Sequence, residues 1–345
     1  MKTAVLGAYG SIGQNVCRML LKLPDIDVTA IGRNKNSAET VLADIWSDIN
    51  YIDSSEISET DTDIIVNTAG ISGMQENDII EMCRKKNIWY ISTGKMPVGI
   101  SGTNCIFDAG SMPGLSLLLP RAVAEKLNCQ INEAEIYYCV QDSFSKNSAK
   151  DFIEGLFDTR KSTMTYYDNG RIIPYTASVE SIPYINGKKK IYSFFDDESE
   201  SLVKYLGLKK EVSAMALEDG RTIKALEEAR RIYQNSPNEA IDKLCRASGL
   251  DTFEIGRYCA LYMEIKSDTE ICSCFAGCNS SGKLTATGAV LCTELIRQKK
   301  LESHFGKMGD IANTSGVLEI IQELADEYHF DISGNYTGEI LTGEI

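Results

Sequence analysis

The 345-residue sequence has few positive charges, little proline and only two histidines. Its 35 Lys and Arg are outnumbered by 49 Asp and Glu, which gives a formal net charge of −14. Such a charge disfavours general binding to nucleic acid or to an anionic membrane, because both require clustered cations. The sequence also lacks an apolar stretch of about 20 residues, so no membrane-spanning helix is expected. Any phosphate-binding site must therefore be local.

An export signal is also missing from the N-terminal residues. Met1-Lys2-Thr3 leads directly into Ala4-Val5-Leu6 and a glycine-rich turn, without the apolar segment of a signal peptide. We therefore expect a cytoplasmic protein. Its eleven cysteines should then be reduced, and most should be buried.

The scarcity of histidine argues against a metal centre. The densest group of potential ligands is Cys272, Cys274 and Cys278, whose spacing is not that of a usual zinc site. Neither His304 nor His329 is close to this group in the sequence. We expect no bound metal, and surface or packing roles for both histidines.

Apolar and polar segments alternate over the first 92 residues. Strands are expected at 3–6, 27–31, 49–52, 63–69 and 88–92, with helices at 11–23, 38–44, 54–59 and 79–86 between them. Strands that alternate with helices in this way predict a doubly wound parallel sheet of the Rossmann type.

The pattern changes after Pro113-Gly114, where strands and helices no longer alternate regularly. Turn sequences at Asp168-Asn169-Gly170 and Asn186-Gly187 separate segments typical of β-structure. Strands are expected at 134–141, 190–194, 258–267 and 270–276, and helices at 115–127, 221–234, 239–247, 287–299 and 316–329. This pattern predicts an inserted α+β domain.

A glycine motif follows the first expected strand and begins the first helix. Gly7, Gly10 and Gly13 occur at the spacing G-x-x-G-x-x-G, a variant of the dinucleotide-binding pattern. Gly7 would permit the turn, Gly10 the approach of a pyrophosphate, and Gly13 close packing of helix on strand. The whole loop is expected to contact the cofactor: Gly7, Ala8, Tyr9, Gly10, Ser11, Ile12 and Gly13. A glycine turn with no ligand is the structural alternative.

The second expected strand is followed by Arg33, Asn34 and Lys35 rather than by an acidic residue. NAD enzymes usually have Asp or Glu here to bind the ribose hydroxyls, whereas a guanidinium can form a forked pair with a 2′-phosphate. This sequence favours NADP(H). An exposed arginine without a ligand is the alternative.

Small residues occur where the fourth and fifth expected strands end. They are Thr68, Ala69 and Gly70 after one strand, and Thr93 and Gly94 after the next. Ligands of open α/β sheets bind at the carboxyl ends of the strands, so we expect these residues to line the cofactor. Ordinary turns would explain them equally well.

Three segments together resemble the saccharopine dehydrogenase NADP-binding family. They are 5–13 with Gly32-Arg33, the loop 108–116, and the segment from Thr287-Gly288-Ala289 to Gly306. The resemblance implies that Gly110, Pro113 and Gly114 line the cofactor. It also implies that the C-terminal segment returns to the first domain, giving an NADP-binding domain of 1–118 plus about 280–330. A substrate and dimerisation domain of 119–279 and a tail of 331–345 complete the expected organisation.

The resemblance implies an NADP(H)-dependent oxidoreductase that transfers hydride to or from a C–N or C–O carbon of a small, amino-acid-like metabolite. Where the family commonly has an acid after the fifth strand, this chain has Lys95. Candidates for proton transfer or substrate binding are Lys95, Asp108, Tyr138 and Asp142. A sensor or scaffold that binds NADP(H) without turnover is one alternative, and different chemistry on a bound nucleotide is another. A homodimer through the strand of Tyr137-Tyr138 is also considered.

Overall fold

The structure is a computed structural model that describes residues 1–70, 73–157 and 161–334. The chain divides into two compact units. Unit 1 comprises Met1–Ala122 and Gly282–Ala325, and unit 2 comprises Val123–Ser281 and Asp326–Ile345. From the sequence we expected a first domain of 1–118 plus about 280–330, a second of 119–279 and a tail of 331–345.

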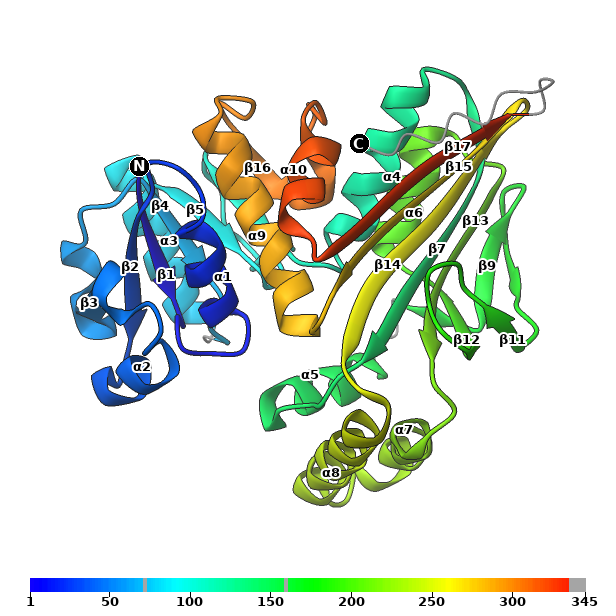
Figure 1. The fold of residues 1–345 in the computed structure, drawn as a ribbon, viewed down its shortest axis with the longest axis horizontal. Coiled ribbons are helices and arrows are strands. Elements are labelled where there is room, and N and C mark those ends of the chain that lie inside the picture. The colour runs from blue at the N-terminus through cyan, green and yellow to red at the C-terminus, as the bar shows by residue number, and fades with distance from the viewer. Residues whose placement is uncertain (71–72, 158–160, 335–345) are drawn as a thin grey trace. The chain divides into compact units, whose positions relative to one another are not determined.

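Unit 1 is built on a parallel sheet (Figure 1). Within the described residues it has seven strands in the order β16-β6-β5-β4-β1-β2-β3, and all the pairings between them are parallel. The strands are β1 (Lys2–Leu6), β2 (Asp27–Gly32), β3 (Asn50–Asp53), β4 (Ile64–Asn67), β5 (Trp89–Ser92), β6 (Cys105–Phe107) and β16 (Phe305–Lys307). The order of β1 to β6 is that of the Rossmann fold, so the predicted fold class is confirmed.

The central strands of this sheet are mostly buried, as expected where helices cover both faces of a parallel sheet. All four residues of β4 are buried, and Ile65 packs with Tyr90 and Phe107 in one core cluster. Unit 1 contains the helices α1 (Gly13–Leu20), α2 (Lys35–Val41), α3 (Gly73–Lys86) and α10 (Val317–Leu324), together with all of α9 (Ser281–Arg297) except its first residue. Helix α4 (Leu115–Leu127) begins in unit 1 and ends in unit 2. The short 3-10 helices are η1 (Trp46–Asp48), η2 (Ser54–Glu59) and η3 (Met308–Asp310).

The C-terminal part of the chain differs from the prediction in one respect. The helix expected at 316–329 ends at Leu324, and strand β17 (Glu327–Gly334) follows it. Tyr328, Phe330 and Ile332 alternate with more exposed residues, which is the period of a strand rather than of a helix. The first residues of the expected tail at 331–345 therefore belong to a sheet, and 335–345 lie outside the described residues.

Unit 2 contains a mixed sheet, to which ten strands contribute within the described residues. Its central strand β7 (Ile131–Gln141) pairs in parallel with β13 (Lys210–Leu217) and antiparallel with β14 (Tyr258–Ser267). The other strands are β8 (Ser162–Thr163), β9 (Thr165–Asp168), β10 (Arg171–Pro174), β11 (Ser178–Ser181), β12 (Lys188–Phe195), β15 (Glu270–Cys278) and β17. The prediction of an α+β second domain is thus confirmed.

The position of β7 bears on the expected dimer surface. β7 lies between two other strands, and Tyr137 is buried in a cluster with Tyr262 and Phe275. Tyr138 on the same strand is partly exposed, and the homodimer stays a prediction.

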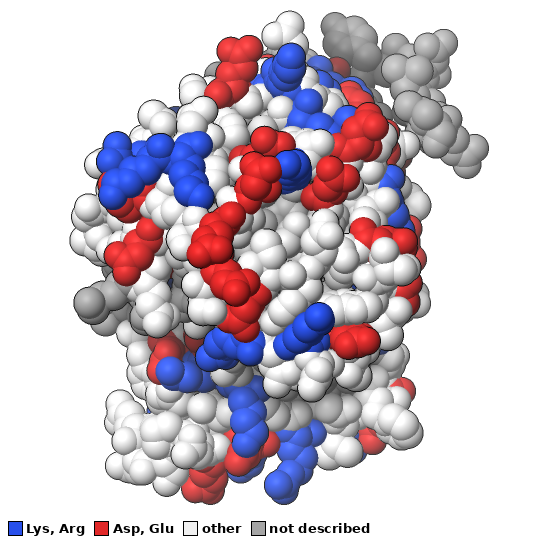
Figure 2. Space-filling view, turned by 90° about the vertical axis from the view of Figure 1, so that its left-hand side faces the viewer, with Lys and Arg blue, Asp and Glu red and all other residues white. Residues whose placement is uncertain are grey.

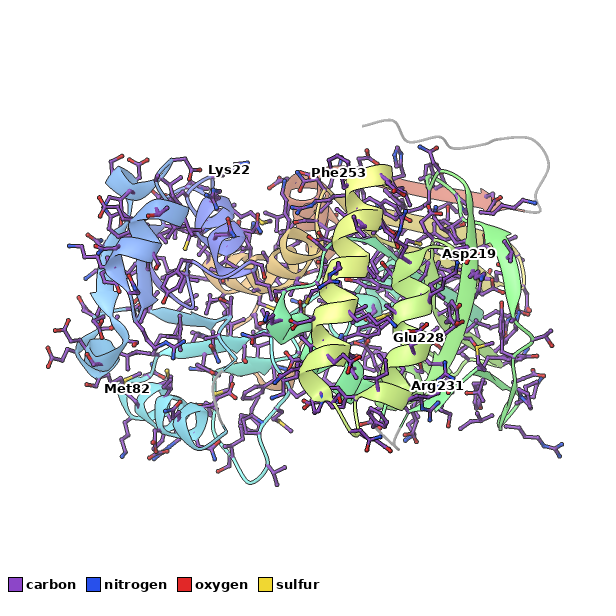
Figure 3. The ribbon with its side chains drawn as sticks, turned by 90° about the horizontal axis from the view of Figure 1, so that it is seen from below. Lys22, Met82, Asp219, Glu228, Arg231 and Phe253 are labelled. Carbon is purple, nitrogen blue, oxygen red and sulfur yellow. The ribbon has the colours of Figure 1, made fainter. Side chains whose placement is uncertain are left out.

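Three helices of unit 2 form a separate cluster. They are α5 (Lys146–Gly155), α7 (Arg221–Ile232) and α8 (Pro237–Ile255), and they share a core that includes Ile153, Ala225 and Leu244. Figure 3 shows α7 and α8 side by side, with Phe253 near the end of α8. Helix α6 (Asp197–Leu206) precedes β13. No helix in the described ranges is long and apolar enough to cross a membrane.

Candidate cofactor site

The loop between β1 and α1 requires its glycines for different reasons. Gly7 has φ +81°, a left-handed conformation, and its N–H donates to the Ile31 carbonyl at 3.0 Å. Gly10 N–H donates to the Gly7 carbonyl at 2.9 Å and closes the turn. A Cβ on Gly13 would lie only 2.2 Å from the Gly7 carbonyl oxygen, so α1 could not pack here with any other residue. This loop has the local conformation that the glycine motif predicts.

Tyr9 packs beside the end of β2. A Cβ on Gly32 would lie 2.3 Å from Tyr9 Cε1, so the ring occupies the space that a side chain at position 32 would need. The Tyr51 hydroxyl donates to the Gly32 carbonyl at 2.7 Å. Two tyrosines therefore frame the point where Arg33 leaves the sheet.

Arg33, Asn34 and Lys35 are exposed at this point. Arg33 makes no hydrogen bond or ion pair with any residue that the structure describes. Asn34 Oδ1 accepts from the Ser37 N–H at 3.0 Å, so this side chain caps α2. The acid opposite Gly32 in the register is Asp53, whose carboxylate accepts from the Ser55 N–H and hydroxyl. These bonds lower the pKa of Asp53 and direct its charge toward Ser55.

Acidic side chains are not spread evenly over this side of the protein, although its net charge is negative. Figure 2 views the molecule from the side of β3 and α2 and shows a band of acidic side chains down the middle of this face, with groups of basic side chains beside and below it. A phosphate would thus be recognised by individual cations rather than by a broad basic surface.

Hydrogen bonds connect the carboxyl end of each central strand to the segment that follows the neighbouring strand. The Thr68 hydroxyl donates to the Leu6 carbonyl at 2.9 Å, and the Thr93 N–H donates to the Asn67 carbonyl at 3.1 Å. Ala109 N–H then donates to the Ser92 carbonyl at 3.0 Å. These bonds bring the segments 68–70, 93–94 and 108–114 to the same carboxyl edge as the glycine loop, where ligands of such sheets bind.

A buried carboxylate lies beneath two of these segments. Glu76 of α3 is 8% exposed, and its Oε1 accepts from the Tyr90 hydroxyl at 2.8 Å and from the Ser92 hydroxyl at 3.1 Å. Asn67 Nδ2 lies 3.3 Å from the same oxygen. Burial, with Glu76 next in importance, raises the pKa of Tyr90 well above its usual value, so its neutral hydroxyl donates.

The same network reaches the backbone of both loops. Asn67 Oδ1 accepts from the Ala69 N–H at 3.0 Å, and Ser92 Oγ accepts from the Gly94 N–H at 3.2 Å. No sequence pattern singles out Glu76, since an acid near the start of a helix is common.

The loop from Asp108 to Gly114 is held tightly by its own backbone and by α9. Gly114 has φ +125°, and a Cβ there would lie 2.3 Å from the Asp108 carbonyl oxygen. A Cβ on Gly288 of α9 would lie 2.6 Å from the Gly110 carbonyl oxygen. The Ser111 and Thr285 hydroxyls are 3.2 Å apart. The segment near 288 therefore packs on this loop, and β16 completes the sheet beside β6.

The candidate catalytic residues divide between the units. Lys95 and Asp108 belong to unit 1, where the Asp108 N–H donates to the Gly94 carbonyl at 2.9 Å. Lys95 is exposed and Asp108 is buried. Their chain segments thus meet at the carboxyl edge of the sheet.

Tyr138 and Asp142 belong to unit 2 and make structural contacts there. The Tyr138 hydroxyl accepts from Cys259 Sγ at 3.2 Å. Asp142 Oδ2 accepts from the N–H and hydroxyl of Ser281, and Arg257 Nε lies 3.6 Å from Oδ1. Asp142 therefore anchors the start of α9.

The cysteine cluster lies within β15 and at its end. Cys272 and Cys274 are buried, and burial raises the pKa of Cys274 to about 12. Among the described residues no group of three or more His, Cys, Asp or Glu could hold a metal ion. His304 contacts the Lys307 carbonyl, and His329 stacks on Tyr184. The absence of metal in the protein stays a prediction.

Comparisons with known proteins agree with this geometry. Residues 3–134 match the family model of the saccharopine dehydrogenase NADP binding domain. The apo saccharopine dehydrogenase (L-Glu forming) from Saccharomyces cerevisiae is 12% identical, with a TM-score of 0.71 over 97% of this chain and 100% of that chain. No curated protein sequence matched.

Two further solved structures show weaker likeness. An oxidoreductase from Agrobacterium radiobacter, in complex with NAD+, L-tartaric acid and magnesium, is 8% identical over 87% of this chain and 89% of that chain, with a TM-score of 0.41. A short-chain dehydrogenase/reductase from Veillonella parvula in complex with NADP is 24% identical over 26% and 46%, with a TM-score of 0.24. These two scores are too low to establish a shared overall fold.

The matched domain is an NADP-binding one, and it supports an oxidoreductase. The match of residues 3–134 to the saccharopine dehydrogenase NADP binding domain agrees with the resemblance seen in the sequence. The chain as a whole has the fold of a saccharopine dehydrogenase.

Proposed function

We propose that the protein is an NADPH-preferring oxidoreductase that transfers hydride to or from a C–N or C–O carbon of a small, amino-acid-like metabolite. The observation that carries this proposal is Arg33, which is exposed at the end of β2 beside a glycine loop of dinucleotide-binding conformation. Asp53, the acid opposite Gly32 in the register, is bonded to Ser55 and does not replace the usual ribose-binding carboxylate.

Each part of the carboxyl edge has a defined task in this proposal. Backbone N–H groups of the glycine loop and of the start of α1 would hold the pyrophosphate. The Arg33 guanidinium would bind the 2′-phosphate through a charge-assisted fork, and Lys35 would add a second cation. Asn34 contributes through its capping of α2, which fixes the chain after Arg33.

The segments after β4, β5 and β6 would line the rest of the cofactor. Thr68, Ala69 and Gly70 would line it after β4, and Thr93 and Gly94 after β5, where the Ala69 and Gly94 N–H groups are bonded to side chains of the Glu76 network. Gly110, Pro113 and Gly114 would line it after β6, where Gly110 packs on α9. NADPH supplies the hydride, while these residues orient it and exclude water.

Lys95 and Asp108 are the residues of unit 1 that we infer to act on substrate. A Lys95 ammonium would bind a substrate carboxylate, and Asp108 would hold or transfer a proton at the reacting nitrogen or oxygen. The contacts of Asp142 and Tyr138 fit a structural role better than a catalytic one. We therefore rank these two residues below Lys95 and Asp108 as candidates for acting on the substrate. A cytoplasmic location and a homodimer stay predictions.

A coupled measurement of binding and turnover tests this function. Purified protein should bind NADPH more tightly than NADH, and should oxidise NADPH in the presence of at least one member of a panel of 2-oxo acids with and without amines. NADPH binding without any turnover would favour the sensor. Equal affinity for the two cofactors would refute the NADPH preference.

A further inference from the structure

The ring of Tyr9 packs on Gly32, the residue that ends β2 and directly precedes Arg33. Gly32 is not among the glycines with a positive φ, so no unusual backbone conformation requires a glycine here. The requirement is one of space, since a Cβ at this position would lie 2.3 Å from Tyr9 Cε1 and 3.0 Å from Tyr9 Cδ1. The Tyr9 ring therefore fills the place that a side chain at position 32 would take.

A second tyrosine, Tyr51 of β3, holds the carbonyl of the same glycine. Its hydroxyl donates to the Gly32 carbonyl oxygen at 2.7 Å, and the Trp46 ring supports it with a centroid distance of 5.9 Å. Burial, followed by the charge of Asp53, raises the pKa of Tyr51, so the hydroxyl stays neutral and donates. The Gly32 carbonyl belongs to the peptide bond that leads into Arg33, so this hydrogen bond fixes the backbone from which Arg33 extends.

The residue on the other side of Arg33 is fixed as well. Asn34 Oδ1 accepts from the Ser37 N–H at 3.0 Å and caps α2. Arg33 therefore lies between two anchored residues while it is itself exposed. A long side chain binds an anion more tightly when the backbone that carries it is already fixed, because less conformational entropy is lost on binding.

We propose that Tyr9 and Tyr51 are positioning residues for Arg33, and that they set the selectivity for NADPH over NADH by fixing the Gly32–Arg33 peptide. They act through the guanidinium, which meets the 2′-phosphate only when this peptide is held in place. The inference rests on the proposed function, since it requires Arg33 to bind that phosphate. NADH lacks the phosphate, so its affinity should not depend on the positioning of Arg33.

The test is a calorimetric titration of the full-length protein with NADPH and with NADH. Tyr9→Ala should lower NADPH affinity at least about fivefold and NADH affinity by less than about twofold, because only the charge-assisted phosphate contact depends on Arg33. Tyr9→Phe keeps the ring and should keep the wild-type ratio of the two affinities. Tyr51→Phe removes one hydrogen bond and should lower NADPH affinity about twofold to tenfold, again without a matching loss for NADH.

Gly32→Ala tests the same packing from the strand. Its methyl group would take the place of the ring, which can turn away as a side chain, so NADPH affinity should fall as it does in Tyr9→Ala. The two changes combined should cost no more than either alone, because the methyl group has no ring left to displace. Tyr9→Ala should likewise have no further effect in an Arg33→Ala background, since no guanidinium remains to be positioned.

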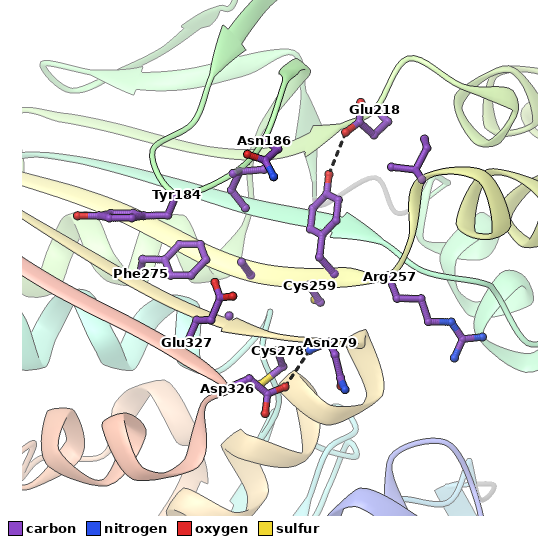
Figure 4. Close-up of a pocket in the computed structure, with 15 residues that line it drawn as sticks. Tyr184, Asn186, Glu218, Arg257, Cys259, Phe275, Cys278, Asn279, Asp326 and Glu327 are labelled. Atoms are coloured by element: carbon purple, nitrogen blue, oxygen red, sulfur yellow. Dashed lines mark hydrogen bonds between the residues drawn. The ribbon is translucent and has the colours of Figure 1, made fainter.

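Tyr184→Ala is the matched control for loss of a tyrosine ring. Tyr184 is exposed in unit 2, where it lies beside Phe275 in the wall of a cavity (Figure 4). The residues that line this cavity all belong to unit 2, so the control should leave both cofactor affinities unchanged.

Two results would overturn the inference while the proposed function stands. One is an equal loss of NADPH and NADH affinity in Tyr9→Ala, which would show that the ring supports the glycine loop as a whole. The other is independent, multiplying losses when Tyr9→Ala is combined with Gly32→Ala or with Arg33→Ala. Equal affinity of the wild type for NADPH and NADH would instead refute the NADPH preference itself, and this inference with it.

Discussion

At the residue scale, the cofactor preference depends on one side chain. Arg33→Asp should reverse the order of affinities, because it removes the cation that would pair with a 2′-phosphate and supplies a carboxylate for the ribose hydroxyls. A hydrogen bond to a charged group contributes roughly 1.5–3 kcal/mol, so NADPH affinity should fall about tenfold to a hundredfold. Fluorescence titration with both cofactors measures this.

Lys22→Asp is the matched control for that change. Lys22 is exposed in unit 1 just after α1. Lys22→Asp changes the net charge of the protein by the same amount as Arg33→Asp. The control should keep the wild-type preference for NADPH. An unchanged preference in Arg33→Asp would remove Arg33 from the phosphate site.

Another residue-scale effect concerns stability in unit 2. Burial raises the pKa of Glu211 to about 8, against a usual value of 4.5, and the Ser213 hydroxyl donates to its Oε1. The folded state therefore keeps a proton that the unfolded chain loses at lower pH. Its stabilising effect is complete below about pH 4.5 and is lost as the pH rises toward about 8.

Glu211→Gln should remove this dependence, because an amide stays neutral at every pH. Compared with the wild type, the variant should gain thermal stability above about pH 6, and the difference in Tm should increase with pH up to about pH 8 and then level off. Calorimetry across the pH series measures it. A constant difference in Tm would show that Glu211 is ionised in the folded protein throughout.

At the scale of elements, α3 fixes the loops after β4 and β5 through Glu76. Glu76→Ala would leave the buried Tyr90 and Ser92 hydroxyls without their acceptor, which costs about 1–3 kcal/mol each when no water replaces it. We expect a lower free energy of unfolding and weaker NADPH binding. Urea denaturation and cofactor titration measure the two effects.

The outer face of α3 offers the control. Glu81 is half-exposed and pairs with Arg84 at the surface, so Glu81→Ala should change the free energy of unfolding by less than about 0.5 kcal/mol. Stability loss in Glu76→Ala with unchanged NADPH affinity would show that the network supports the sheet but not the cofactor loops.

The helices and strands of the structure can be compared with those predicted from the sequence. The alternation of strands and helices up to Ser92 and the glycine loop were sufficient for the Rossmann order, because both depend on local patterns. β6 and β16 were missed since each is only three residues long, and β16 joins the sheet from the far end of the chain. The Glu76 network was missed because it depends on contacts between α3, β4 and β5, which no spacing in the sequence expresses.

At the scale of the whole molecule, the question is which residues of unit 1 meet the substrate. Lys95 is exposed after β5, and its segment is linked to the Asp108 loop by the hydrogen bond to the Gly94 carbonyl. A cation at this place can bind a substrate carboxylate but is separate from the proposed phosphate site at Arg33.

Lys95→Met should therefore lower turnover or raise KM for the substrate while NADPH affinity stays unchanged. Methionine retains most of the apolar length of lysine but removes the charge, so at least a tenfold loss in kcat/KM is expected from one charge-assisted contact. Steady-state NADPH oxidation and cofactor titration would be measured on the same preparation. Lys22→Met, the same change at an exposed site after α1, should leave both unaffected. Normal kinetics in Lys95→Met would exclude Lys95 from the site and leave Asp108 as the remaining candidate in unit 1.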